Sequence, residues 1–92
     1  YDPAGLVTRR QMAAFLSRLW LLLRPDTQVG GEHPFTDIES GDYAAPYVAL
    51  IYELGITKGV SPTAYAPDNL VSREQMAAFL ARFIRALTAS AL

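Results

Sequence analysis

Two arginines stand where chemistry with an anion is possible. Arg9 directly follows Thr8 and Arg73 directly follows Ser72, in each case ahead of an amphipathic segment. A hydroxyl residue there is typical of a helix N-cap, so both arginines are expected in a first helical turn. A cation in that turn opposes the helix dipole by about 0.3 to 1 kcal/mol, whereas free amides and a guanidinium together can hold a carboxylate. The sequence indicates a carboxylate receptor at each arginine, with a solvated arginine or an ion pair to Asp37 as the alternative.

The side chains needed for catalysis or for a transition metal are scarce. The 92 residues include no cysteine and one histidine, His33, which excludes a disulfide framework, a thiolate nucleophile and a histidine cluster. The helical carboxylates Glu53 and Glu74 belong to different segments, so no acid and base are expected in one pocket. We therefore expect no enzyme activity and no cofactor.

An acidic segment resembles a calcium loop only superficially. Asp37, Glu39 and Asp42 follow one another at short intervals. An EF-hand loop requires glycine where Asp42 stands and glutamate where Val48 stands, so this geometry fails and no metal site is predicted.

Composition and charge describe a small globular chain. Hydrophobic residues make up 51% of it, and eight Lys and Arg balance nine Asp and Glu for a formal charge of −1. Scattered cations of this number give no basic surface for nucleic acid. The longest apolar run, residues 19–23, is far shorter than the roughly 18 residues that span a bilayer. Neither a nucleic-acid partner nor a membrane span is expected, and a signal peptide would have been removed or would lie upstream of Tyr1.

The two arginines lie at equivalent positions of an internal repeat. Residues 1–20 align without gaps on residues 65–84, and twelve of the twenty positions are identical. This predicts the second half of one repeat in 1–24, a linker in 25–34, a complete repeat in 35–88 and a tail in 89–92.

The periodicity predicts three helices. Thr8 with Gln11, and Ser72 with Gln75, fit the capping box and start helices near 9–24 and 73–88. Both helices carry an apolar stripe. The stripe residues are Met12, Phe15, Leu16, Leu19, Trp20 and Leu23 in the first, and Met76, Phe79, Leu80, Phe83, Ile84 and Leu87 in the second. A shorter helix is expected near 43–54, starting between Asp42 and Ala45, with Pro46 in its first turn and Gly55 as its cap. The predicted fold is all-α, a small bundle of helix-loop-helix repeats.

Five short motifs follow one another along the complete repeat. They are Phe35-Thr36-Asp37-Ile38, Tyr43-Ala44, Gly55-Ile56-Thr57-Lys58-Gly59, Tyr65-Ala66-Pro67 and Val71-Ser72-Arg73-Glu74-Gln75. In this order they resemble the S-layer homology family, and the resemblance covers about three-quarters of the chain. The sequence departs from the family pattern at Tyr43, where tryptophan is usual, and at Gln11 and Gln75, where glutamate is usual. Three such repeats normally form one pseudo-threefold unit with ligand grooves between them, and this chain supplies one and a half.

The resemblance implies a secreted module of the bacterial envelope that binds an acidic, commonly pyruvylated, wall polysaccharide without a covalent bond. It implies ligand-binding roles for Arg9, Arg73, Asp37, Tyr43 and Gly59. Each has a plainer alternative: Asp37 pins a loop, Tyr43 packs at the core or its rim, and Gly59 serves the backbone.

The rival hypothesis is a structural helical repeat that associates with other repeats without binding sugar. These would be repeats of a longer chain or of a second copy of this one. The half repeat is expected to leave a flank of Trp20 and Leu23 facing outward as an interaction patch.

Overall fold

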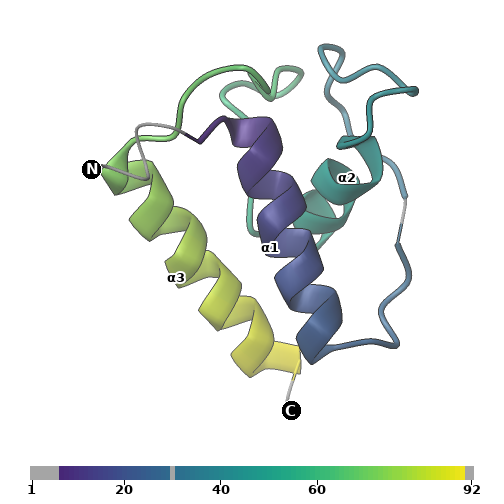
Figure 1. Ribbon diagram of the computed structural model, residues 1–92, viewed down its shortest axis with the longest axis vertical. Coiled ribbons are helices and arrows are strands. Elements are labelled where there is room, and N and C mark those ends of the chain that lie inside the picture. Colours follow the sequence, from purple (N-terminus) through teal and green to yellow (C-terminus); the bar gives the residue numbers. More distant parts are fainter. Residues whose placement is uncertain (1–6, 30, 91–92) are drawn as a thin grey trace.

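The computed structural model describes residues 7–29 and 31–90, which form three helices. These are α1 (Arg9–Leu23), α2 (Ala45–Glu53) and α3 (Arg73–Ser90) (Figure 1). The described ranges contain no strand, only isolated bridges between Thr8 and Leu70 and between Ser61 and Ala64. The predicted all-α fold is confirmed. None of the helices in these ranges has the length and hydropathy needed to cross a membrane.

Both long helices begin at the predicted capping boxes. Thr8 Oγ1 accepts from the Gln11 N–H at 3.1 Å, and Gln11 Oε1 accepts from the Thr8 N–H at 2.9 Å. Ser72 and Gln75 exchange the same two bonds at the same distances. Each box satisfies two amides at a helix start, so the two starts are locally equivalent.

The ends of α1 and α2 depend on residues that leave the helical conformation. Arg24 stands before a proline and adopts φ −136° and ψ 71°, so α1 ends at Leu23, one residue earlier than predicted. Helix α2 ends in a Schellman arrangement, since the Gly55 N–H donates to Tyr52 O and the Ile56 N–H donates to Ile51 O. Gly55 takes φ +77°, which explains glycine at this position.

The start of α2 lies at the late end of the predicted range. The helix begins at Ala45, and the range was Asp42 to Ala45. Asp42 Oδ1 accepts from the Ala44 N–H at 2.9 Å, and Asp42 O accepts from the Ala45 N–H at 3.0 Å. This local turn competes with the helix for the same backbone groups. Tyr43 therefore lies in the turn before α2.

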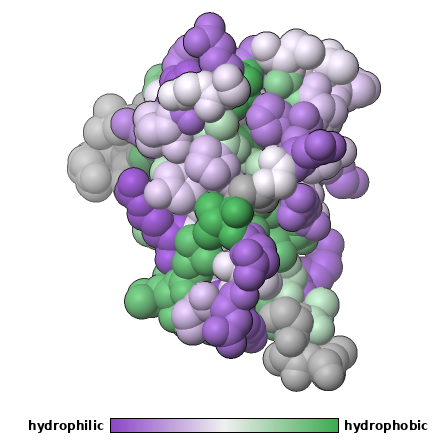
Figure 2. Space-filling model, turned by 90° about the vertical axis from the view of Figure 1, so that its right-hand side faces the viewer, coloured by the Kyte–Doolittle hydropathy of each residue, from purple (hydrophilic) through white to green (hydrophobic). Residues whose placement is uncertain are grey.

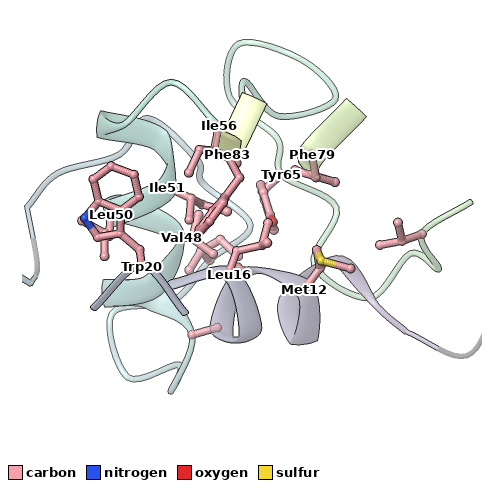
Figure 3. Close-up of a cluster of buried hydrophobic side chains, with 14 of the residues drawn as sticks. Met12, Leu16, Trp20, Val48, Leu50, Ile51, Ile56, Tyr65, Phe79 and Phe83 are labelled. Atoms are coloured by element: carbon pink, nitrogen blue, oxygen red, sulfur yellow. The ribbon is translucent and has the colours of Figure 1, made fainter. Parts of the chain in front are cut away.

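The core lies between the three helices and the loop that leads to α3. Figure 3 shows Leu16 from α1, Val48 and Ile51 from α2, and Phe79 and Phe83 from α3 converging. Trp20 meets Phe83 edge to face, with ring centroids 5.8 Å apart. Buried aliphatic and aromatic contacts of this kind supply most of the stability of a small domain.

The prediction that a flank of Trp20 faces outward is wrong. Trp20 is only 3% exposed, and its indole N–H donates to Thr27 Oγ1 at 2.8 Å. The start of the linker folds back and covers it. Leu23, in contrast, is exposed as expected. Leu80 and Ile84, which were also expected in a buried stripe, are exposed because the neighbouring elements cover the other edge of α3.

Candidate functional site

The first turn of α1 inserts a charged side chain into the complete repeat. Arg9 is only 5% exposed. Its Nε donates to Tyr65 O at 2.5 Å, and its Nη2 lies 3.5 Å from Thr57 Oγ1. The guanidinium carbon is 4.4 Å from the centroid of the Tyr65 ring and 5.3 Å from that of Phe79. We call Arg9, Thr57, Tyr65 and Asp37 the junction, because they join the half repeat to the complete one.

The junction carries positive charge that no carboxylate contacts directly. Burial lowers the pKa of Arg9, and the nearby charge of Arg82 lowers it further, against opposing contributions from Tyr65 and Asp37. In the described part of the chain, no carboxylate oxygen lies within 4 Å of the Arg9 guanidinium, since both ion pairs there belong to Arg10. A buried cation of this kind is costly and attracts an anion.

Tyr65 stays neutral at the centre of the junction. Burial raises the pKa of Tyr65 to about 12, although Arg9 and Thr57 oppose this shift. Its hydroxyl donates to Arg9 O at 3.0 Å, so Tyr65 is bonded to Arg9 at both its carbonyl and its hydroxyl. This double contact fixes the N-terminus of α1 against the loop.

Asp37 holds the same loop from the other side. Its carboxylate accepts from the Tyr65 N–H at 2.9 Å and from the Ala66 N–H at 2.8 Å. Burial raises the pKa of Asp37, but these backbone donors outweigh it and the pKa lies below its usual value. Ala66 takes φ +58°, a conformation that L residues rarely adopt. The carboxylate thus pins the loop that leads to α3, and its ionised form is the one stabilised.

Gly59 lies against other atoms of the protein and not against open solvent. It takes φ +80°, and a Cβ added there would lie 2.4 Å from the Phe35 ring and 2.6 Å from Ala64 O. Its N–H lies 3.4 Å from Thr57 Oγ1. The space beside Gly59 is therefore filled by Phe35 and the loop backbone.

The first amides of α1 are already used. The Arg9 N–H donates to Asn69 O and the Arg10 N–H donates to Pro67 O, both at 2.9 Å. The Gln11 N–H is held by the capping box. Carbonyl groups of the loop thus occupy the place where an anion was expected, and the amides at the start of α1 cannot form the receptor.

The structure brings three of the five predicted site residues together. Arg9 and Asp37 belong to the junction, and Gly59 contacts it through Thr57. Arg73 begins α3 with an exposed side chain, and Tyr43 is exposed in the turn before α2. Both lie outside the buried cluster.

Sequence reasoning missed the partners that organise the junction. Thr57 and Tyr65 stand in motifs that were recognised, but no spacing rule assigns them to Arg9, which is 48 and 56 residues away. Arg82 was also missed; its Nη1 lies 3.5 Å from Ile56 O, which places its charge beside the junction.

A second polar contact ties α1 to the complete repeat. Arg10 forms an ion pair with Asp42 at 2.9 Å and a further ion pair with Asp68. The bond from Arg10 lowers the pKa of Asp42, and these two carboxylates raise the pKa of Arg10. Elsewhere in the described ranges, no three metal-binding side chains come close enough to hold an ion.

The sequence of this chain is similar to parts of several known proteins. Residues 34–77 match the family model of the S-layer homology domain. The chain is 34% identical over 88 residues to an amylopullulanase of Thermoanaerobacterium thermosulfurigenes, covering 96% of this chain and 4% of that protein. It is 36% identical over 76 residues to endo-1,4-beta-xylanase A of Thermoanaerobacterium saccharolyticum, covering 83% and 6%. It is 29% identical over 84 residues to an S-layer protein of Bacillus thuringiensis subsp. finitimus, covering 89% and 10%. In each case the matched region is a small part of the relative.

Proposed function

We propose that this chain, which belongs to the S-layer homology domain family, is a non-catalytic module that attaches a larger protein to the bacterial cell envelope. Family membership and the similarity to an S-layer protein and to two large polysaccharide-degrading enzymes support this role. The chain corresponds to 4 to 10% of those relatives, so most of each relative lies outside the matched region. Its location would be the outer surface of the cell, after secretion.

The ligand we propose is an acidic wall polysaccharide, bound without a covalent bond. The observation that carries this proposal is the positive charge at the junction, where Arg9 and Arg82 lie close and no carboxylate contacts Arg9 within the described ranges. A carboxylate-bearing sugar, such as a pyruvylated one, would neutralise that charge.

The five predicted residues would then divide their roles. Arg73 and Tyr43 have exposed side chains, so they would contact the sugar, Arg73 through its guanidinium and Tyr43 by stacking. Arg9, Asp37 and Gly59 would hold the loop in place, since their side chains or backbone are engaged inside the protein. At the junction itself, the half-buried guanidinium of Arg82 would face the acidic group, because that of Arg9 is buried.

The test is binding to purified cell-wall material. We expect the protein to sediment with it and to be released by a pyruvylated saccharide. Arg73→Ala should weaken binding by about 1.5 to 3 kcal/mol, which is tenfold or more. Arg85→Ala, which removes an exposed arginine further along the same helix, is the matched control. Equal binding by both variants, with folding intact, would exclude Arg73 from the sugar site.

A second candidate function is association with another repeat, supported by an apolar groove between α1 and α3. The groove has a volume of about 470 Å³ and is lined by Val7, Gln11, Met12, Phe15 and Met76. Figure 2 shows that hydrophobic residues also gather in the lower half of another face. A repeat of the same longer chain, or a second copy, could cover such a surface. Light scattering on the wild type and on Phe15→Glu tests this, and a monomer in both cases would exclude self-association.

A further inference from the structure

The end of the linker folds onto α2 around one buried ring. Phe35 is buried, and the imidazole of His33 stacks on it with centroids 5.5 Å apart and an interplanar angle of 21°. The Tyr52 ring, from α2, meets the same phenyl ring edge to face at 5.4 Å. Phe35 therefore holds one ring from the linker and one from the helix in fixed positions.

A second contact holds the linker close to α2. Gly31 takes φ +114°, and a Cβ added there would lie 2.2 Å from Glu53 Oε1. The Glu53 carboxylate thus packs against the linker backbone at a place that only glycine fits. The linker segment that follows is held against the helix from both ends.

These contacts shape a shallow hollow on the surface. It has a volume of about 270 Å³ and is lined by Glu32, His33, Pro34 and Tyr52. The Tyr52 side chain is 37% exposed, and His33 is half-buried. The residues that line this hollow are not those of the junction, and they include none of the five residues assigned to the acidic site.

The hollow offers one donor and one acceptor beside the aromatic surface. The Phe35 N–H donates to His33 Nδ1 at 3.1 Å, so the neutral imidazole carries its proton on Nε2. Glu32 is exposed, and its carboxylate makes no hydrogen bond or ion pair within the residues described. An N–H donor, a carboxylate acceptor and a ring face are the groups that sugar hydroxyls and C–H faces need.

We propose that this hollow is a subsite for an uncharged pyranose residue of the polysaccharide. An acidic sugar would be repelled by Glu32, whereas a neutral one can donate hydroxyl hydrogens to it and lay its C–H face on Tyr52. The inference rests on the proposed function, because it supplies a neutral residue of the same polymer beside the acidic one. One chain would then contact two kinds of sugar at two separate places.

The first experiment uses simple sugars on the intact chain. Methyl glycosides of glucose and N-acetylglucosamine are titrated while backbone and imidazole resonances are followed by NMR. We expect shifts at residues 32–34 and at Tyr52. Tyr52→Ala should abolish them, and Tyr52→Phe should retain them because the ring remains. Val60→Ala, an exposed apolar residue of another loop, is the control and should behave as wild type.

The second experiment uses wall polysaccharide whose carboxyl groups have been reduced to alcohols. Tyr52→Ala should weaken its binding by about fivefold, while Arg73→Ala should leave it unchanged. Thermal unfolding of each variant checks that the fold is retained. If Tyr52→Ala unfolds, Glu32→Ala, which removes the exposed carboxylate of the same hollow, repeats the comparison. If no wall polysaccharide binds but the glycosides shift these residues, the proposed function fails and the subsite stands. If polysaccharide binds the wild type and Tyr52→Ala equally and no glycoside shifts the hollow, the subsite is overturned and the function stands.

Discussion

Helices α1 and α3 have nearly the same sequence and different surroundings. Phe15 of α1 is 55% exposed, whereas its equivalent in α3, Phe79, is 2% exposed. The relation reverses one residue later, because Leu16 is buried and its equivalent Leu80 is exposed. A stripe of apolar residues thus has two edges, and the neighbouring elements decide which edge is covered. The periodicity predicts which residues form the apolar stripe, but it does not predict which edge of that stripe is buried.

The starts of the two helices differ in the same way. Arg9 is buried in the junction, and its equivalent Arg73 is exposed. The next residue is Arg10 in α1, where it pairs with Asp42, and Glu74 in α3. The capping boxes are alike, so the difference comes from the loop that packs on α1 and not from the helix itself. The arginine of the repeated motif is therefore buried and structural at the start of α1, whereas it is exposed at the start of α3.

The largest expected difference in stability between the two helices concerns Phe79 and Phe15. Phe79→Ala should lower the free energy of unfolding by about 3 to 5 kcal/mol, because it leaves a cavity in the core. Phe15→Ala should lower it by about 1 kcal/mol or less, since more than half of that side chain is in solvent. Urea unfolding followed by circular dichroism measures both. Equal losses would show that the two helices bury the same face.

The next effect concerns the two arginines. Arg9→Ala should lower the free energy of unfolding by about 2 to 3 kcal/mol, because it removes charged hydrogen bonds and leaves Tyr65 O unpaired in the interior. Arg73→Ala should change it by about 0.5 kcal/mol or less, as expected for an exposed side chain. Thermal unfolding of the two variants tests this. A larger loss for Arg73 would contradict the division of roles between the copies.

The sequence predicts local features of this fold well. The two capping boxes and the existence and order of three helices follow from short-range patterns, and the structure confirms them. The start of α2 falls at the last residue of the predicted range, because the turn at Asp42 competes for the same backbone groups.

Features that depend on contacts between distant segments could not be predicted. The burial of Arg9 depends on Tyr65, 56 residues away, and the burial of Trp20 depends on the linker folding back to Thr27. Of the five residues that the sequence predicts to bind ligand, Arg9, Asp37 and Gly59 lie around Thr57 and Tyr65. It could not tell that the loop backbone would occupy the amides of α1, because that needs the packing of one repeat on the other.

A smaller effect is the dependence of stability on pH, which is expected to differ between the starts of the two helices. The pKa values of Asp37 and Asp42 lie below 3.8 in the folded state. Their ionised forms therefore add stability above about pH 3.8, and this contribution is lost as the pH falls from there through the folded pKa. Asp42→Asn should reduce stability near neutral pH and flatten its decline in acid. The measurement is the unfolding midpoint in urea between pH 7 and 2.5.

The matched control for the acid test lies on the other helix. Glu74→Gln replaces the exposed carboxylate at the position equivalent to Arg10, where no hydrogen bond or ion pair is formed with the described residues. The unfolding midpoint of Glu74→Gln should fall in acid by as much as that of the wild type. If Glu74→Gln reduces this fall and Asp42→Asn does not, the acid-sensitive contact lies at α3.

The smallest effect concerns the capping boxes, where the two copies are most alike. Thr8→Ala and Ser72→Ala should each lower the free energy of unfolding by about 1 kcal/mol, because each leaves a first-turn amide without its side-chain acceptor. The surroundings make the two amides unequal all the same. Thr8 is half-buried against the loop, with a bridge to Leu70, whereas Ser72 is exposed. Thr8→Ala should therefore cost more than Ser72→Ala, and Thr8→Ser, which keeps the acceptor, should restore most of the loss. An equal cost at both positions would mean that the caps act only within their own helices, and that the difference between α1 and α3 begins one residue later, at Arg9.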